Sequence, residues 1–396
     1  MGLLIAAAAL ILGYGAAYLA SSDIRYLTRA GIEQTLILQK RRPIEKIIAD
    51  PDTDPETRAY LGLVLEVREH AARLGLEAGN TYTRYTDVGR DTLLLVLSAS
   101  ARDCICPVVW KYPIVGRIPY KGFFDPEMAR REAERLGREG HDTYLRPAGA
   151  YSTLGWFEDP LLSTAMVRDS VELAATVFHE ITHNTLYLKS ATPFNESFAQ
   201  MVGYRSAEEF FRSRGDTVLA GRARDRWHDE IVLGEYYREL LDRLHAFYAG
   251  RPSGDSLEAG RQAIGRWARE QLEGPIGARL RTFRVARLAE RPINNAALVG
   301  VRIYRTHLDW FERWYDRHGR SVSASVAALR DLMKGVSGDS AFARLERALE
   351  PEGGVRGTGA GGYLYSPAQA RLAGTAARRE PPTEERRQPR TPVSDE

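Results

Sequence analysis

The sequence predicts an α+β fold, because the spacing of its apolar residues changes twice along the chain. Helical spacing dominates residues 23–90, short strand-like runs fill residues 91–160, and helical spacing returns over residues 161–350. The 396 residues are 44% hydrophobic and 27% charged, as in an ordinary folded soluble protein. A formal net charge of +3 is too small to indicate a nucleic-acid partner.

An uncharged run of 18 residues, from Leu3 to Ala20, begins the chain. It is long enough to cross a bilayer, and it lacks the basic residues that start a signal peptide. We expect residues 1–22 to form a membrane anchor or an uncleaved signal, with the rest of the chain outside the cytosol. A buried N-terminal core helix is the alternative.

The next segment, residues 23–90, is predicted to be helical. From Ser21 to Arg73 the apolar positions indicate two helices, interrupted by a turn at the acidic and proline-rich stretch 50–55. No chemistry is indicated there, and His70 is expected on a helix surface.

Residues 91–160 are predicted to form a small sheet layer. Strands are expected at 92–98, as two runs within 108–124 and at 142–156, with a helix over 126–138 capped by Asp125. The two cysteines, Cys104 and Cys106, are separated by one residue, which matches no zinc framework. We assign them no catalytic role, and their redox state stays open.

Residues 161–215 carry the main chemical motif, His179-Glu180-x-x-His183. Asp169, with Glu172 three residues later, marks the start of the helix that carries it. The four-residue spacing puts both imidazoles on one helix face, where they can bind a single Zn²⁺, with Glu180 beside the open coordination position.

A second predicted helix supplies a third metal ligand. Thr192 can cap this helix and Pro193 can begin it, which places Glu196 in its first turn, thirteen residues after His183. A hydrolytic zinc site needs three protein ligands and one exchangeable water, and Glu196 is the nearest downstream acid. The alternative is an acid that only complements the helix dipole.

The stretch HEITHNTLYLK followed by FNESFAQMVG resembles the zincin metallopeptidases whose third zinc ligand is a glutamate on the next helix. It is most similar to a family of bacterial envelope aminopeptidases, and the similarity extends to residues 41–44, 120–124, 150–157 and 293–296. The resemblance implies a zincin-like fold with a small sheet above the active-site helix, release of N-terminal amino acids, and an inner-membrane anchor facing the periplasm. Family members carry a lipid-modified cysteine after the N-terminal segment, and this chain has none there.

The resemblance also implies roles for other residues. In zincins the edge strand of the sheet pairs with the extended peptide substrate, and we assign this role to residues 151–157, although an ordinary edge strand is the alternative. The substrate-binding candidates are Ser152, Gly155, Trp156 and Glu158. In related zincins a Tyr or His donates to the oxyanion, so Tyr304 and His307 are catalytic candidates beside Glu180.

Residues 216–350 are predicted to be a helical subdomain, and residues 351–396 a disordered tail that is poor in apolar side chains. Within the subdomain, long helical segments are expected at 256–290 and at 296–315. The preceding helix carries an apolar stripe expected in the core: Trp227, Ile231, Tyr236, Leu240, Leu241, Leu244 and Phe247.

The predicted function is a zinc-dependent peptidase that acts on a peptide substrate, with aminopeptidase as the first choice. An aminopeptidase must hold the α-ammonium of its substrate, and Glu158 and Asp159 are the acids available for this near the predicted edge strand. Two alternatives stay open. One is an endopeptidase of the bacterial envelope, and the other is a non-catalytic, membrane-tethered interaction protein with a structural zinc closed by a fourth ligand.

Overall fold

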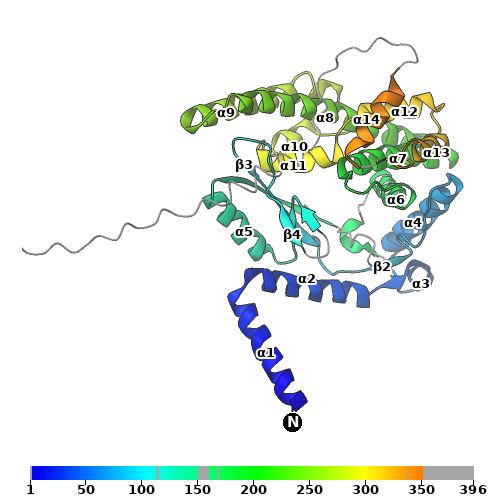
Figure 1. Ribbon diagram of the computed structural model, residues 1–396. Coiled ribbons are helices and arrows are strands. Elements are labelled where there is room, and N and C mark those ends of the chain that lie inside the picture. The colour runs from blue at the N-terminus through cyan, green and yellow to red at the C-terminus, as the bar shows by residue number, and fades with distance from the viewer. Residues whose placement is uncertain (1, 113–115, 150–159, 167–168, 337, 351–396) are drawn as a thin grey trace, which may run out of the picture. The chain divides into compact units, whose positions relative to one another are not determined.

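The computed structural model describes residues 2–112, 116–149, 160–166, 169–336 and 338–350 (Figure 1). These described residues belong to one compact unit. The described chain is α+β and mostly helical, with three small sheets, which confirms the predicted class. The expected substrate strand at 151–157 and the tail from 351 lie outside the described residues.

The apolar run at the start of the chain forms helix α1 (Gly2–Ala20), which is followed by α2 (Ser22–Gln39). Large side chains of α1 are exposed, with Leu10 at 75% and Leu12 at 74%, so α1 is not the buried core helix considered as an alternative. None of the helices in the described part of the chain is, by itself, both long and apolar enough to span a membrane. Leu4–Ala20 and Ser22–Gln39 meet the criterion only together, and a bend of 111° separates them.

Three helices, rather than the two expected, occupy residues 21–73. After α2 come the short α3 (Ile44–Ala49) and the longer α4 (Pro55–Arg73). His70 was expected on the surface of α4, and this prediction is wrong, since the residue is only 6% exposed. Its ring centroid lies 6.0 Å from that of Phe178 and 5.4 Å from that of Phe210, because this face of α4 packs against the helices that carry these two phenylalanines.

The central strand of the largest described sheet is β3 (Leu94–Ala101), which pairs antiparallel with β6 (Lys121–Phe123) and β7 (His141–Ala148). Its side chains alternate between two apolar surfaces. Leu97 packs against α5 (Pro126–Arg138), whereas Val96 packs on the other side with Ile37 of α2. The smaller sheets contain β1 (Arg42–Pro43), β2 (Arg84–Thr86) and β8 (Leu161–Leu162), and β4 (Trp110–Tyr112) with β5 (Gly116–Ile118).

The long C-terminal segments are broken where the sequence analysis expected continuity. Segment 256–290 divides at Gly274-Pro275, because proline removes a backbone donor and clashes with the preceding turn. Segment 296–315 divides after Tyr304, and His307, whose φ of 53° is left-handed, is the N-cap of the next helix. The helices are α8 (Thr217–Ala249), α9 (Gly254–Glu273), α10 (Val285–Ala289), α11 (Asn295–Tyr304), α12 (Leu308–Arg317), α13 (Val322–Leu332) and α14 (Ala341–Leu349).

The predicted core stripe of α8 is confirmed. Trp227, Tyr236, Leu240 and Leu244 are buried, and the remaining three side chains pack against the core while partly exposed.

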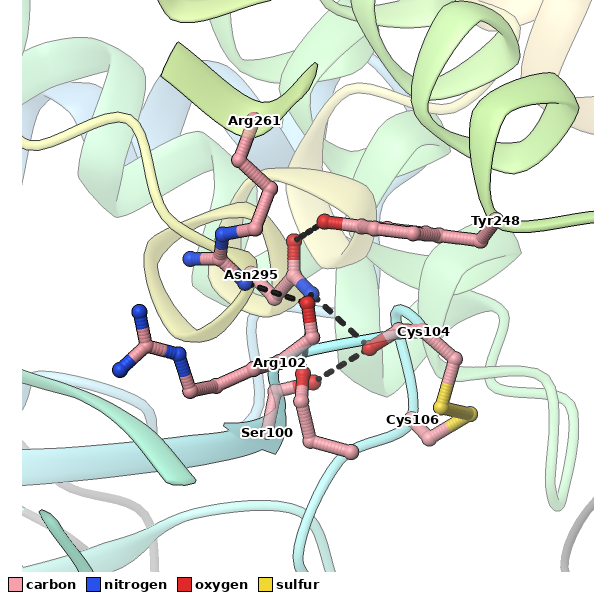
Figure 2. The surroundings of a disulfide bond; sticks show 8 residues. Ser100, Arg102, Cys104, Cys106, Tyr248, Arg261 and Asn295 are labelled. Atoms are coloured by element: carbon pink, nitrogen blue, oxygen red, sulfur yellow. Dashed lines mark hydrogen bonds between the residues drawn. A yellow bond between two sulfur atoms is a disulfide. The ribbon is translucent and has the colours of Figure 1, made fainter. Parts of the chain in front are cut away.

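Asn295 joins the first turn of α11 to the end of β3 (Figure 2). Its side-chain amide donates to the carbonyls of Ala101, Arg102 and Cys104, and its carbonyl accepts from the hydroxyl of Tyr248 at 2.9 Å. These bonds hold the loop in which Cys104 and Cys106 form a disulfide. The start of α11 is therefore fixed to the sheet by a buried side chain.

Candidate metal and catalytic site

Helix α6 (Ser170–Thr185) positions the two histidines of the motif. Its N-cap is Asp169, as predicted, and the Asp169 carboxylate accepts from the backbone N–H of Val171 at 2.9 Å. His179 and His183 follow one turn apart, and their rings lie with centroids 4.8 Å apart. Buried apolar side chains on the other faces of α6 fix the orientation of this pair.

The second helix, α7 (Thr192–Ser213), brings Glu196 to the histidines. The cap residue of α7 is Ala191 rather than Thr192, and Pro193 stands in the first turn as predicted. The connection is fixed by Asn195, which is only 1% exposed. Its side chain accepts from the N–H of Leu188 at 3.0 Å and donates to the carbonyl of the same residue at 2.8 Å.

Gly203 allows the two helices to approach each other closely. A Cβ at this position would lie 2.7 Å from the carbonyl oxygen of Ala175 and 3.5 Å from the Cβ of His179. A side chain there would push α6 away from α7. The glycine therefore sets the separation between the histidines and Glu196.

The ligand atoms of the three residues converge. The Nε2 atom of His179 lies 3.1 Å from Oε2 of Glu196 and 3.2 Å from Nε2 of His183, and the latter lies 3.6 Å from Oε1 of Glu196. A tetrahedral zinc site with bonds of about 2.05 Å has ligand atoms roughly 3.3 Å apart, so these separations fit zinc. Among the described residues this cluster contains no fourth His, Cys, Asp or Glu.

In the metal-free cluster, the pKa of His179 is raised and that of His183 is lowered. Burial alone would lower the pKa of His179, but the hydrogen bond with Glu196 and the charges of Glu180 and Glu196 raise it. Burial lowers the pKa of His183 to about 4, helped by the charge of His179. Burial opposes ionisation of Glu196, yet the hydrogen bond from His179 and the charges of both imidazoles lower its pKa.

The charge of Glu196 acts on three tyrosines, Tyr304, Tyr120 and Tyr187. Burial raises the pKa of Tyr304, and the next largest causes are the charges of Glu196 and Tyr120, followed by smaller effects of Arg146 and Glu180. Burial and then Glu196 also raise the pKa values of Tyr120 and Tyr187. The Tyr187 ring centroid lies 6.1 Å from that of His183. The charge of the half-buried Glu180 contributes to the pKa shifts of both His179 and Tyr304.

The structure places His307 in an aromatic group on α12 and α14. Its ring stacks on Trp310 at 3.8 Å and contacts Phe342 edge-on at 5.1 Å. Burial lowers its pKa to about 4, and the charges that act on it are those of Asp309 and Arg238. Of the two predicted oxyanion donors, Tyr304 is the one whose environment includes Glu196.

All four predicted substrate-binding residues, and the second candidate for the α-ammonium, belong to one segment of the chain. Ser152, Gly155, Trp156, Glu158 and Asp159 lie outside the described residues.

The sequence analysis did not assign roles to Tyr120, Tyr187 or Arg146. Tyr120 stands in one of the segments that carried the family resemblance. Tyr187 lies two residues past the end of α6, in the connection to α7, so helical spacing from His183 does not identify it.

Residues 25–340 match the model of the family described as "Putative aminopeptidase". The chain belongs to this family. The match includes every residue of the cluster and most of the chain. Membership in this aminopeptidase family indicates a peptidase, and thus a hydrolase. No curated protein matches the chain significantly, and no solved structure does.

We predict that Gly203→Ala destabilises this aminopeptidase family member by about 1–3 kcal/mol, because α6 and α7 must separate to admit the new methyl group. Urea unfolding followed by circular dichroism would measure the change. The matched control is Gly62→Ala in α4, where an added Cβ would meet nothing within 4 Å. The control should be neutral or more stable by about 1 kcal/mol or less. Equal stability of the two variants would show that Gly203 does not set the helix separation.

Proposed function

We propose that the protein is a zinc-dependent aminopeptidase of the zincin type. The observation that carries this proposal is the convergence of two imidazole nitrogens and a carboxylate at separations that suit a tetrahedral metal. Membership in the aminopeptidase family supports the reaction class. Three protein ligands leave one position of a tetrahedral ion for water or substrate, as hydrolytic zinc sites require.

His179, His183 and Glu196 would hold the ion. When bound there, zinc would lower the pKa of a water molecule towards about 7 and polarise the substrate carbonyl. Because Asn195 clamps the connection between the ligand helices, the three side chains are held near one another before any ion binds. Such preorganisation favours a single arrangement of the three ligand side chains around an ion.

Glu180 is assigned as the general base. It lies three residues before His183 on α6, about a sixth of a turn around the helix axis, so its carboxylate borders the same face. Glu180 takes a proton from the attacking water and returns it to the leaving amine.

Tyr304 is assigned as the donor to the oxyanion. Its raised pKa keeps the phenol protonated through the neutral range, so that it can donate a hydrogen bond as negative charge develops. The sheet formed by β3, β6 and β7 is the part of the fold that would lie beside the substrate in a zincin-like arrangement.

A structural zinc in a non-catalytic protein would call for a fourth protein ligand. The two asparagines nearest the motif make other contacts. Asn184 donates to the carbonyl of Glu77 at 3.1 Å, and Asn195 is engaged by Leu188. The described residues therefore support an open site over a closed one.

For Glu180→Gln, turnover should fall roughly 10²–10⁴-fold, because the amide cannot accept the proton, while zinc content stays near one ion per chain. Peptide hydrolysis and metal analysis by mass spectrometry would be measured on the same zinc-loaded preparation. Glu134→Gln on the exposed face of α5 is the control for loss of one carboxylate. Retained turnover in a zinc-loaded Glu180→Gln protein would remove Glu180 from the mechanism.

The donor role of Tyr304 predicts a loss that appears in kcat. Tyr304→Phe should lower kcat roughly 10²–10³-fold and change KM little, because the hydroxyl acts mainly in the transition state. His307→Phe keeps a ring stacked on Trp310 and should retain turnover. A larger loss of kcat in the His307 variant than in the Tyr304 variant would make His307, and not Tyr304, the donor to the oxyanion.

The terminal amine of the substrate separates an aminopeptidase from an endopeptidase. A free tripeptide should be cleaved at least roughly ten- to a hundredfold more efficiently than its N-acetylated form, since acetylation removes a charged hydrogen-bonding group. Chromatography of the products at matched concentrations would measure both rates. Equal cleavage of the blocked peptide would indicate an endopeptidase.

A further inference from the structure

A cavity of about 210 Å³ adjoins the candidate site along helix α11. Its walls come from β7, the helices α8 to α11 and the segment that joins α10 to α11. Tyr304, the last residue of α11, lines the cavity and also responds to the charge of Glu196. Tyr304 thus connects the cavity with the predicted metal ligands.

One face of α11 forms a wall of the cavity. Ala297, Val301 and Tyr304 recur at intervals of four and three residues, as side chains on one side of a helix do. Gly300 lies beside them, and a Cβ at that position would meet nothing within 4 Å. Small residues in the middle of this face leave the space open.

The cavity is positively charged. Among the described residues that line it, three are arginines, Arg146, Arg291 and Arg305, and none is acidic. Arg305 forms an ion pair with Glu230, in which its guanidinium lies 2.7 Å from the carboxylate. Arg146 projects from β7, two residues after Tyr144 on the same face of the strand, and its charge reaches both Tyr120 and Tyr304.

The size of the cavity limits what it can hold. Sites for drug-sized ligands measure roughly 300–1,000 Å³, so this space suits one side chain or the end of a short chain. Its charge disfavours an ammonium group and favours an anion, and arginine binds carboxylates through paired hydrogen bonds. The substrate α-ammonium therefore belongs elsewhere in the site.

We propose that this cavity binds a carboxylate of the peptide substrate through Arg146, so that the enzyme prefers peptides with an acidic group close to the cleaved bond. This inference rests on the proposed peptidase function. The carboxylate has two possible sources, an acidic side chain or the free C-terminus of a short peptide. Arg146 is a specificity-determining residue in this account, and Tyr304 lies between it and the reacting carbonyl.

Two matched peptide pairs distinguish the sources. One pair differs only in glutamate against glutamine beside the cleaved bond, and the other differs only in a free against an amidated C-terminus. The wild-type protein should cleave the carboxylate member of at least one pair with roughly tenfold or greater kcat/KM, the effect of one charged hydrogen-bonded contact. Arg146→Gln should abolish this preference, measured as the ratio of kcat/KM values within each pair.

Arg138→Gln on the exposed end of α5 is the matched control, and it should keep the preference. Equal kcat/KM for both members of both pairs overturns the inference while leaving the peptidase function intact, because the neutral peptides are still cleaved. A preference that survives in Arg146→Gln also overturns it.

A binding measurement makes the inference independent of turnover. Titration calorimetry on zinc-loaded Glu180→Gln should show tighter binding of the carboxylate member of the preferred pair, and the double variant with Arg146→Gln should lose this difference. If the wild-type protein cleaves no peptide, the proposed function fails, and the calorimetry still decides whether the cavity selects a carboxylate. Equal affinity for both members of each pair counts against the cavity in either case.

Discussion

The packing of α6 against α7 is the constraint on which the site depends. His179 and His183 share a helix, so their mutual spacing is fixed by the helix itself. Glu196 belongs to the next helix, and its distance from them depends on how closely the two helices approach and where the connection ends. Gly203 permits the approach, and Asn195 fixes the connection by pairing with both backbone groups of Leu188. Neither residue would touch a bound ion, yet both determine whether one could be held.

The second constraint connects the sheet to the chemistry through α11. Asn295 binds three backbone carbonyls at the end of β3, and Tyr304 stands at the other end of the same helix beside the cluster. The sheet therefore supports the candidate oxyanion donor as well as forming its own core with α5. A carboxylate network on α8 has a similar supporting function. Asp229, fully buried, accepts from the backbone N–H groups of Arg281, Thr282 and Phe283, which fixes the segment that leads to α10.

Local signals predicted much of the fold and the three possible ligands. The capping residues Asp169 and Asp125 mark the starts of α6 and α5 correctly, because an N-cap acts on backbone groups two or three residues away. The four-residue spacing of the histidines is equally local. Helix breaks were harder to predict. No glycine or proline lies between Tyr304 and His307, where one break falls, whereas Gly274-Pro275 does mark the other break.

What the sequence could not predict depends on contacts between distant segments. Tyr120 and Arg146 reach the site from the sheet layer, more than thirty residues before His183, and nothing in their neighbours indicates a shared destination. The burial of His70 likewise depends on α6, which is remote in the chain. Contacts between residues far apart in the sequence can be identified only in the folded chain. Helix caps, turns and the spacing of residues along a helix can be recognised in the sequence.

Helix α11 also fixes the direction in which Tyr304 points relative to Asn295. Its ten residues span about 15 Å, and each residue turns the helix by about 100°. The anchoring amide and the phenol at its two ends are therefore related by a fixed rotation as well as a fixed length. A single-residue insertion between them would leave Asn295 in place and rotate the Tyr304 phenol by about a quarter of a turn, away from the three candidate ligands. The length of this helix is therefore as restricted as the identity of its end residues.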